Sequence, residues 1–184
     1  DRSRLALVRS QTLPWVASPA PGVERRLLER LGGEVARATS IVRYDPGSRF
    51  ASHAHELGEE FLVLRGTFSD EHGDYPAGTY VRNAPGSRHA PFSRNGCELF
   101  VRLRQMAPQE TESICIRPGD RAWIADAVHG IEVLPLCRDA HCEVVLERWA
   151  PGTARPAGTS AGGEEWLLLG GSVQREANGE RTTL

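Results

Sequence analysis

The sequence is poor in the features that mark secreted, membrane-spanning and nucleic-acid-binding proteins. Four cysteines in 184 residues are too few for a disulfide framework, and none forms a Cys-x-x-Cys pair. No apolar run approaches the roughly 18 residues that span a bilayer, and the first residues lack a secretory signal. The sequence has 22 basic and 24 acidic side chains, and it contains no cluster of Lys and Arg of the kind that binds the phosphates of nucleic acids. We therefore expect a cytoplasmic protein with no direct nucleic-acid or membrane partner.

What the sequence does contain is typical of an all-β protein. Hydrophobic residues make up 40% and charged residues 25%, which is ordinary for a globular chain. Short runs rich in β-branched and aromatic residues alternate with Gly, Pro, Asp and Asn turns at roughly ten-residue spacing, the pattern of a sandwich or jelly roll. These runs are "ATSIVRY", "EEFLVLRG", "GTYVRN", "ELFVRLRQ", "EVVLERW" and "EEWLLLGG".

An internal repeat organises the chain. The dipeptide Pro46–Gly47 recurs as Pro151–Gly152, and the passages that follow stay in register at this offset of 105 residues. A weaker match upstream pairs Trp15 with Trp123. The repeat predicts a first unit at residues 1–107 and a second unit at 113–184, with "APQETES" as a polar linker between them. The aligned pairs include Tyr44 and Trp149, Glu59 and Glu164, Phe61 and Trp166, and Gly66 and Gly171.

The repeat also decides a local ambiguity. Taken alone, "VERRLLERLGGEV" has apolar residues on one helical face, as an amphipathic helix would. Its partner in the second unit carries Pro135 in mid-segment, which the interior of a helix tolerates poorly. We therefore predict strands at both places. Near the second of them, "CRDAHC" could be a soft-metal clip, but a polar loop between apolar strands fits its surroundings better.

Three residues at strand spacing suggest a metal site. His53 and His55 are two apart, so in a strand both imidazoles project to one face. Glu59 can reach the same space if the "ELG" segment makes a tight corner. Two imidazoles and a carboxylate resemble a facial ligand set that leaves coordination positions open on a divalent metal. A fourth ligand is available in His89, which follows a Pro-Gly turn as a returning hairpin would.

Neighbouring polar residues have simpler interpretations. A single histidine is more often a hydrogen-bonded surface or core residue than a ligand, and His72 is expected at a hairpin tip. Glu60 could serve as an acid or base, but adjacent strand residues face opposite sides, so we expect it to face solvent or pair with a neighbouring strand.

The same residues resemble the two cupin motifs. "PGSRFASHAHELGEEFLVLRG" fits the first motif through Gly47, His53, His55, Glu59 and Gly66. "PAGTYVRNAPGSRH" is similar to the second through Gly78, Pro85, Gly86 and His89, with one residue of difference at the Pro-Gly turn and Ser93 where Asn usually follows. More narrowly, "EEFLVLRGTFSDEHGDYPAGTYVRN" and the repeated "RWAPGT" resemble the cupin domain of ChrR-type anti-sigma factors and its two-cupin relatives.

This resemblance implies a fold and a ligand set. The fold would be a tandem pair of RmlC-like jelly-roll β-barrels. The implied metal ligands are His53, His55, Glu59 and His89, with zinc the usual ion and iron, manganese or nickel in other cupins. The resemblance also implies an N-terminal helical segment with a His-x-x-x-Cys-x-x-Cys zinc motif. Since no His precedes His53 and no Cys precedes Cys97, sigma-factor binding is not carried over by residues.

The second unit is expected to have lost its site. At the repeat offset, Gly158 and Ser160 stand where the first unit has histidines, although Glu164 remains. The counterpart of His89 would fall after Leu184. We therefore expect one metal per chain and an incomplete second barrel, whose open edge a second subunit could cover in a homodimer.

Three functions remain open at this point. The first is a metal-binding sensor or regulatory module. The second is a metal-dependent dioxygenase or related cupin enzyme that binds a small molecule at the metal. The third is ligand storage or a scaffold, with the pocket closed by the aromatic residues Phe50, Phe61, Tyr80 and Phe92.

Overall fold

The computed structural model describes residues 6–33, 36–156, 158, 162–177 and 180–183, and in this part of the chain the regular structure is β apart from one short 3₁₀-helix. No helix in the described residues is long and apolar enough to cross a membrane. The residues divide into two compact units, one formed by Leu7–Thr153 and the other by Asp1–Ala6 with Ala154–Leu184.

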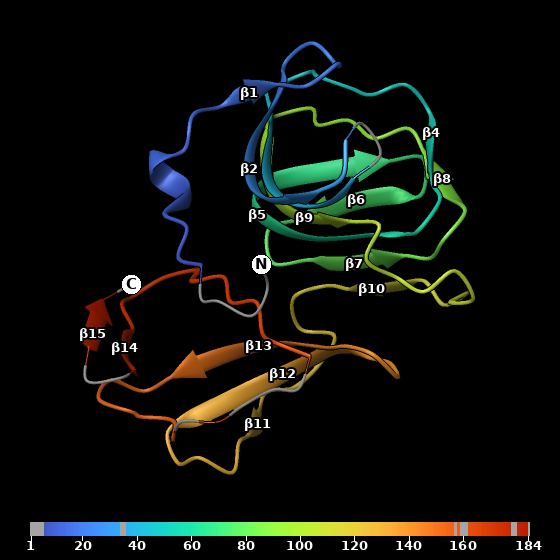
Figure 1. The fold of residues 1–184 in the computed structure, drawn as a ribbon. Coiled ribbons are helices and arrows are strands. Elements are labelled where there is room, and N and C mark those ends of the chain that lie inside the picture. The colour runs from blue at the N-terminus through green and yellow to red at the C-terminus, as the bar shows by residue number, and fades with distance from the viewer. Residues whose placement is uncertain (1–5, 34–35, 157, 159–161, 178–179, 184) are drawn as a thin grey trace. The chain divides into compact units, whose positions relative to one another are not determined.

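The larger unit contains the 3₁₀-helix η1 and strands β1 to β13, and the smaller unit contains β14 and β15 (Figure 1). Their bounds are η1 Ser10–Thr12, β1 Val16–Ala17, β2 Val23–Leu31, β3 Arg37–Tyr44, β4 His53–His55, β5 Glu59–Asp70, β6 Gly73–Pro76, β7 Tyr80–Asn83, β8 Ser87–His89, β9 Cys97–Leu103, β10 Ile114–Ile116, β11 Ile124–Ala125, β12 Ile131–Arg138, β13 Glu143–Trp149, β14 Gln174–Ala177 and β15 Glu180–Thr183. The predicted strand at "VERRLLERL" is confirmed, because these residues form β2.

One large antiparallel sheet and one small sheet make the jelly roll. The large sheet has the order β1-β2-β3-β9-β5-β7-β10, with β6 paired to β5, and β4 pairs with β8 in a sheet of two strands. Figure 1 shows β4 and β8 together at one side of this barrel. The order is not sequential, since β9 lies between β3 and β5, which is the crossover expected of a jelly roll.

The interior of the barrel is an aromatic and aliphatic core. Alternate residues of each strand point inward, so the core takes every second position of the large sheet. Phe61, Phe68 and Tyr75 form edge-to-face ring contacts there, with centroids 4.8 Å apart for Phe61 and Phe68. Phe61 and Tyr75 are fully or almost fully buried. Two of the aromatic residues considered as pocket walls therefore differ in role: Phe61 is core, whereas Phe50 lies at the edge of this cluster.

The three-strand arrangement β1-β2-β3 recurs in β11-β12-β13. Both are antiparallel meanders, and each central hairpin contains one register shift at the corresponding place. The corresponding pairs are Val23–Tyr44 and Ile131–Trp149, and the corresponding shifts lie at Leu27/Glu29 and Pro135/Cys137. The structure therefore repeats three strands of the first unit, whereas a complete second barrel is not confirmed. The division of the chain near residues 107–113 stays a prediction.

Side-chain contacts recur with the strands. Arg43 pairs with Glu24 and lies over the ring of Trp15, at 4.3 Å from its centroid. In the second meander Arg148 pairs with Glu132 at 2.7 Å and lies over the Trp123 ring at 4.6 Å. The pairing of Trp15 with Trp123 that the sequence suggested thus corresponds to equivalent positions in the two meanders. Each meander thus has an equivalent set of three side chains, in which an arginine pairs with a glutamate and lies over a tryptophan ring.

The second meander packs on the outer face of the large sheet. Leu136 of β12 is buried in a cluster with Leu62 of β5 and Tyr80 of β7. Beside this cluster lies a network of buried charges. Arg82 donates to Glu60 at 2.9 Å and to Asp139 at 2.7 Å. The face that would otherwise contact water is therefore an interior surface in this unit.

This packing corrects the expectation for Glu60. Its side chain faces away from the barrel interior, as strand alternation predicts, but it does not face solvent, since Glu60 is only 4% exposed. It accepts from Arg82, from Arg102 at 2.7 Å and from the hydroxyl of Tyr80 at 3.0 Å. The pairing with neighbouring strands was correct, and exposure to solvent was wrong because β12–β13 covers this face.

The "CRDAHC" segment forms the turn between β12 and β13. Oδ1 of Asp139 accepts hydrogen bonds from the amides of His141 and Cys142, each at 2.7 Å. The thiol of Cys137 lies 3.1 Å from a nitrogen of Arg82. These contacts fit the polar loop rather than a metal clip. All four cysteines of the chain are free.

The smaller unit contains a hairpin, β14–β15. The expected strand at "EEWLLLGG" is wrong, since residues 164–171 form no strand. In the first copy the equivalent strand β5 is held between β7 and β9. No such neighbours pair with residues 164–171 in the described part of the chain, so strand propensity alone does not form a strand here. Trp166 is 56% exposed as a result.

Candidate metal centre

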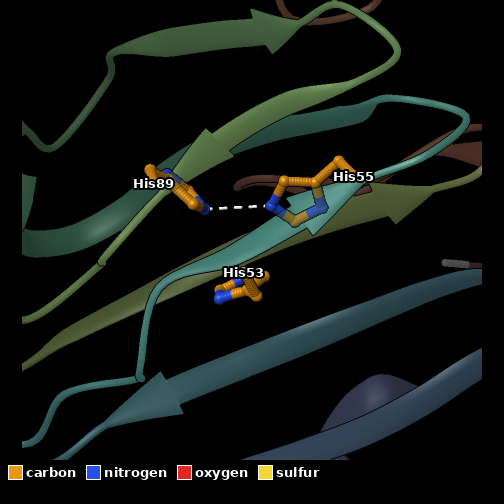
Figure 2. A group of neighbouring side chains, drawn as sticks. All are labelled: His53, His55 and His89. Atoms are coloured by element: carbon orange, nitrogen blue, oxygen red, sulfur yellow. Dashed lines mark hydrogen bonds between the residues drawn. The ribbon is translucent and has the colours of Figure 1, made fainter.

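Two short strands bring the three predicted histidines together. His53 and His55 belong to β4, and His89 belongs to β8. The strands pair antiparallel, with His53 directly opposite His89. Figure 2 shows the three rings converging between these strands. The structure thus assembles the histidines that the spacing singled out, and their role as ligands stays a prediction.

The three rings form a nearly regular triangle. Their centroids are 4.8 Å apart for His53 and His55, 4.9 Å for His55 and His89, and 5.1 Å for His53 and His89. One ring nitrogen from each can be chosen so that all three lie within 4.8 Å of one another. His55 and His89 are 9% and 3% exposed, whereas His53 is half-buried. Three imidazoles gathered in this way suggest a metal site.

The other ring nitrogens are occupied, which orients two of the rings. Nδ1 of His53 lies 2.9 Å from the carbonyl oxygen of Ala51, and Nδ1 of His89 lies 3.2 Å from Oδ2 of Asp70. When Nδ1–H donates to these oxygens, Nε2 of each ring keeps its lone pair. Metal-binding histidines in proteins are commonly held by this kind of contact.

A tight corner returns Glu59 to the histidines. Gly58 adopts a φ of +74°, and its amide donates to the carbonyl oxygen of His55 at 3.1 Å. A side chain at Gly58 would also collide with Met106, whose sulfur would lie 2.3 Å from the added Cβ. Oε2 of Glu59 lies 3.4 Å from Nε2 of His55 and 3.5 Å from Nε2 of His89. The corner anticipated in the "ELG" segment is present.

These separations suit a shared metal ion. Zinc bonds to nitrogen and oxygen of about 2.0–2.1 Å in a tetrahedral site place neighbouring ligand atoms about 3.3–3.4 Å apart. Nε2 of His55 and Nε2 of His89 are 3.0 Å apart, and the two distances to Glu59 are close to the tetrahedral value. The donor set therefore fits a divalent transition metal.

Burial and charge act on these histidines in opposite ways. Burial lowers the pKa of His55, an effect that Glu59 only partly offsets. Burial also opposes the charged form of His89, but the hydrogen bond to Asp70 and the charge of Glu59 outweigh it and raise the pKa of His89. The pKa of Asp70 is lowered: burial opposes this, and donors including His89 prevail. Burial thus favours the neutral form of His55, which is the form that binds a metal.

Two supporting residues were not found from the sequence. Asp70 orients His89, and it also accepts from the hydroxyl of Tyr75 at 3.1 Å. Asn83 donates from Nδ2 to Oε2 of Glu59 at 3.2 Å. Asp70 could have been noticed in the sequence as an acidic residue at the end of a long strand. Only the curvature of the barrel, however, places it beside His89, which is 19 positions away.

A cavity of about 280 Å³ adjoins the cluster. It reaches Asp70, Asn83 and His89, which are residues of the site itself or its supports. Its outer wall includes Cys115 of the edge strand β10. His72, expected at a hairpin tip, lies in the β5–β6 turn and also lines this cavity. Small molecules thus have a space beside the candidate metal centre.

For the second unit the sequence predicts that the metal site has been lost. Gly158 is described and offers no ligand, while Ser160 lies outside the described residues. Glu164 is exposed, and its Oε2 accepts from the indole of Trp166 at 2.8 Å.

A match to a family model shows the family to which this chain belongs. The model of the ChrR cupin-like domain matches residues 3–107, which is more than half of the chain. The chain belongs to the ChrR cupin-like domain family. In this ChrR-like cupin, the matched residues contain all three clustered histidines and Glu59.

Several solved structures are similar to this ChrR-like cupin. One is the anti-sigma protein ChrR of Rhodobacter sphaeroides in complex with SigE, at 25% identity and a TM-score of 0.44, covering 52% of this chain and 51% of that one. A candidate acetylacetone dioxygenase from Methylibium petroleiphilum has 19% identity and a TM-score of 0.50, covering 61% and 90%. A candidate glyoxylate-induced protein from Pseudomonas aeruginosa has 12% identity and a TM-score of 0.58, covering 75% and 59%.

The ChrR-like cupin spans about half the length of the R. sphaeroides protein. No curated protein sequence matched it in the comparison made.

Proposed function

We propose that this ChrR-like cupin is a regulatory module that senses through one divalent metal ion, held by His53, His55, His89 and Glu59. The observation that carries the proposal is the triangle of imidazoles, in which the Nδ1 atoms of His53 and His89 face oxygen acceptors and Nε2 remains for a ligand bond. Membership of the ChrR cupin-like domain family supports the regulatory role.

Zinc is the proposed ion. It accepts nitrogen and carboxylate oxygen ligands in tetrahedral sites, and three imidazoles with one carboxylate supply four such donors. The metal would supply a fixed positive charge. The residues of the chain orient the donors: Asp70 holds His89, Asn83 holds Glu59, and the carbonyl of Ala51 holds His53. Iron, manganese and nickel are the alternative ions, since imidazole and carboxylate are ligands for them as well.

The proposal extends to the whole chain. We propose a tandem cupin in which residues 113–184 form a degenerate second copy without a metal, so that each chain holds one ion. A homodimer and a cytoplasmic location belong to the same proposal. The recurrence of the β1–β3 meander in β11–β13 supports the duplication.

A metal-dependent dioxygenase is the second candidate, favoured by the cavity beside His89. A volume of about 280 Å³ accommodates a small organic molecule, and this space borders the candidate metal centre directly. The likeness to a candidate acetylacetone dioxygenase concerns the fold. In this alternative, the small molecule would bind at the metal and react with oxygen.

Elemental analysis tests both candidates. Protein without an affinity tag, purified without added metal or chelator, is analysed by plasma mass spectrometry. About one zinc per chain, with no oxygen consumption in the presence of diketones, is the result expected for the regulatory module. One iron, manganese or nickel per chain, with oxygen consumption, would replace it by the dioxygenase. Protein that takes up no metal even after zinc is supplied would refute both.

A further inference from the structure

Polar contacts on the two faces of the large sheet meet where strand β5 begins. Glu59, the first residue of β5, faces the barrel interior, where Asn83 donates to its carboxylate at 3.2 Å. Glu60, the next residue, faces the outer side, where Arg82 donates to it at 2.9 Å. Both contacts join residues that are directly opposite each other in the pairing of β5 with β7. The same two strands thus carry a candidate metal ligand on one face and a buried ion pair on the other.

Three donors fix Glu60. Besides the contact with Arg82, it accepts from Nη1 of Arg102 at 2.7 Å and from the hydroxyl of Tyr80 at 3.0 Å. These donors belong to β7 and β9, the two strands that flank β5. Because Glu59 directly precedes Glu60, a shift of the backbone at Glu60 would also move the Glu59 carboxylate relative to the histidines. A well-ordered site needs its groups held to within about 0.5 Å, so the outer contacts act on the metal centre.

Arg82 connects this point to the second meander, β11–β13. Its Nη2 donates to Oδ2 of Asp139, in the β12–β13 turn, at 2.7 Å, and also to Glu110. Asp139 is itself held in place, because its Oδ1 accepts from two amides of the turn. The thiol of Cys137 lies 3.1 Å from Nη1 of Arg82. One guanidinium thus contacts the barrel, the segment that follows it and the second meander.

The network is buried and depends on its central cation. Arg82 and Glu60 are buried, and the side chains of Glu110 and Asp139 are about one-fifth exposed. Three carboxylates therefore converge on one guanidinium, and they would repel one another without it. Movement of the turn that carries Asp139 would leave Arg82 with fewer partners and would change its contact with Glu60.

We propose that the buried network of Glu60, Arg82 and Asp139 positions the candidate metal ligand of β5, and that the second meander thereby controls how tightly the ion is held. While the meander is packed on the barrel, the network keeps Glu59 in place. When the meander moves away, Glu59 is less well placed and the ion binds more weakly. By linkage, a bound ion strengthens the packing of the meander to the same degree. The inference rests on the proposed function, because it concerns the same ion, and it assigns a regulatory role to the second copy.

The zinc affinity of an Arg82→Gln variant tests the positioning role. It is measured by competition with a chelator of known affinity, at a temperature where circular dichroism shows the variant to be folded. Loss of a group that supports a metal ligand should lower the affinity about 10-fold or more. A purely electrostatic effect has the opposite sign, because removal of a cation near the ion would strengthen zinc binding. The visible absorption of the cobalt(II) form should also change, since it reports ligand geometry and is insensitive to a merely less stable fold.

Arg88→Gln is the matched control. Arg88 precedes His89 on β8, and its side chain is exposed on the face of the β4–β8 pair opposite to the histidines. This variant removes the same charge close to the candidate metal centre without removing a contact of the network. It should bind zinc as tightly as the unaltered protein or more tightly. Equal loss in the two variants would overturn the proposal, as would an unchanged zinc affinity or cobalt spectrum in a folded Arg82→Gln variant.

Two buried thiols test the linkage without depending on the folding of the Arg82 variant. Cys137 lies where the second meander meets the barrel, and Cys97 lies in the barrel core. Their modification by N-ethylmaleimide is followed by mass spectrometry of peptides, with and without zinc. Zinc should slow the reaction of Cys137 about fivefold or more, because the ion stabilises the packed meander. Asp139→Asn keeps an oxygen for the turn amides but removes the charge that faces Arg82, so it should abolish this effect at Cys137.

The outcomes separate this inference from the proposed function. Zinc that binds but leaves the rate at Cys137 unchanged, or slows it equally in Asp139→Asn, would overturn the linkage and leave the metal site in place. Slowing in the His53→Ala/His55→Ala double variant would mean that zinc acts on the thiol directly, which would also overturn the linkage. Absence of zinc binding by the unaltered protein would refute the proposed function and this inference together.

Discussion

The meander β1–β3 and the meander β11–β13 have the same pairing and the same bulge, yet they have different surroundings. The first continues into β9 and β5 and encloses an aromatic core with the histidine cluster. The second forms a separate sheet of three strands and packs its Leu136 side against the outside of the barrel. A shared local structure therefore does not by itself bring the same residues together. The candidate metal ligands lie on β4, β5 and β8, outside the repeated strands.

The largest contrast between the two copies is expected in metal content. Replacing His53 and His55 together by Ala removes two of three clustered imidazoles, so metal binding should be abolished. Glu164→Gln, in the second copy, should leave it unchanged, because that carboxylate is exposed and belongs to no cluster of possible metal ligands found among the described residues. Plasma mass spectrometry on both variants measures this. Retention of metal in the histidine double variant would refute the site.

The interface between the second meander and the barrel should contribute strongly to stability. Arg82→Met leaves Glu60 buried with one fewer counter-charge, and removal of one partner from a buried ion pair costs about 3–5 kcal/mol. Urea denaturation followed by tryptophan fluorescence gives the free energy of unfolding. Arg148→Met, which breaks the exposed pair with Glu132, is the matched control and should have little effect. Similar losses in the two variants would contradict the burial described for Arg82.

Packing of the second meander should also be measurable through an apolar residue. Leu136→Ala deletes a side chain that is 2% exposed, and such deletions cost about 2–5 kcal/mol through lost transfer energy and a residual cavity. The comparison is Leu168→Ala in the smaller unit, where the side chain is 43% exposed. The same urea experiment should show a large effect for the first and a small one for the second. The reverse order would mean that residues 164–171 pack in solution.

A smaller effect is expected from the support of His89. Asp70→Asn keeps the size of the side chain but removes the charge that faces Nδ1 of His89, and loss of such a support costs about 10- to 100-fold in metal affinity. Competition with a zinc chelator of known affinity measures it. Asp74→Asn changes an exposed carboxylate of the same hairpin and serves as the control. Unchanged zinc affinity in the Asp70 variant would mean that another group orients His89.

The sequence predicted local pairing better than burial. Strand alternation placed His53 and His55 on one face, and Pro135 indicated that β2 and β12 are strands rather than helices. Both depend on backbone geometry within a few residues. The burial of Glu60 was missed, because alternation says which way a side chain points and not what lies there. That position is covered by β12–β13, which comes more than 70 residues later.

The bulge in β2 and the strand predicted at residues 164–171 both show that a local sequence pattern does not specify how a strand pairs with its neighbours. A one-residue insertion reverses the faces of all later positions, and no pattern in "VERRLLERL" marks where it lies. Residues 164–171 have strand composition but no paired neighbours in the described residues, since a strand is stabilised by cross-strand contacts rather than by its own propensity. Asp70 was missed for a related reason, because its contact with His89 requires the curvature of the whole barrel.

The order of strands in the large sheet also has a consequence for how the molecule acquires its structure. The pairing of β3 with β9 joins Ala38 to Leu103, so it requires closure of a long loop, whereas β11, β12 and β13 pair with their sequence neighbours. Closing long loops slows folding because chain entropy is lost before contacts form. The large sheet of the barrel can close only after β9 has been synthesised, because β9 pairs with both β3 and β5, whereas the β11–β13 meander pairs within its own residues. We therefore expect closure of the barrel that carries the candidate metal centre to be the slow step of folding.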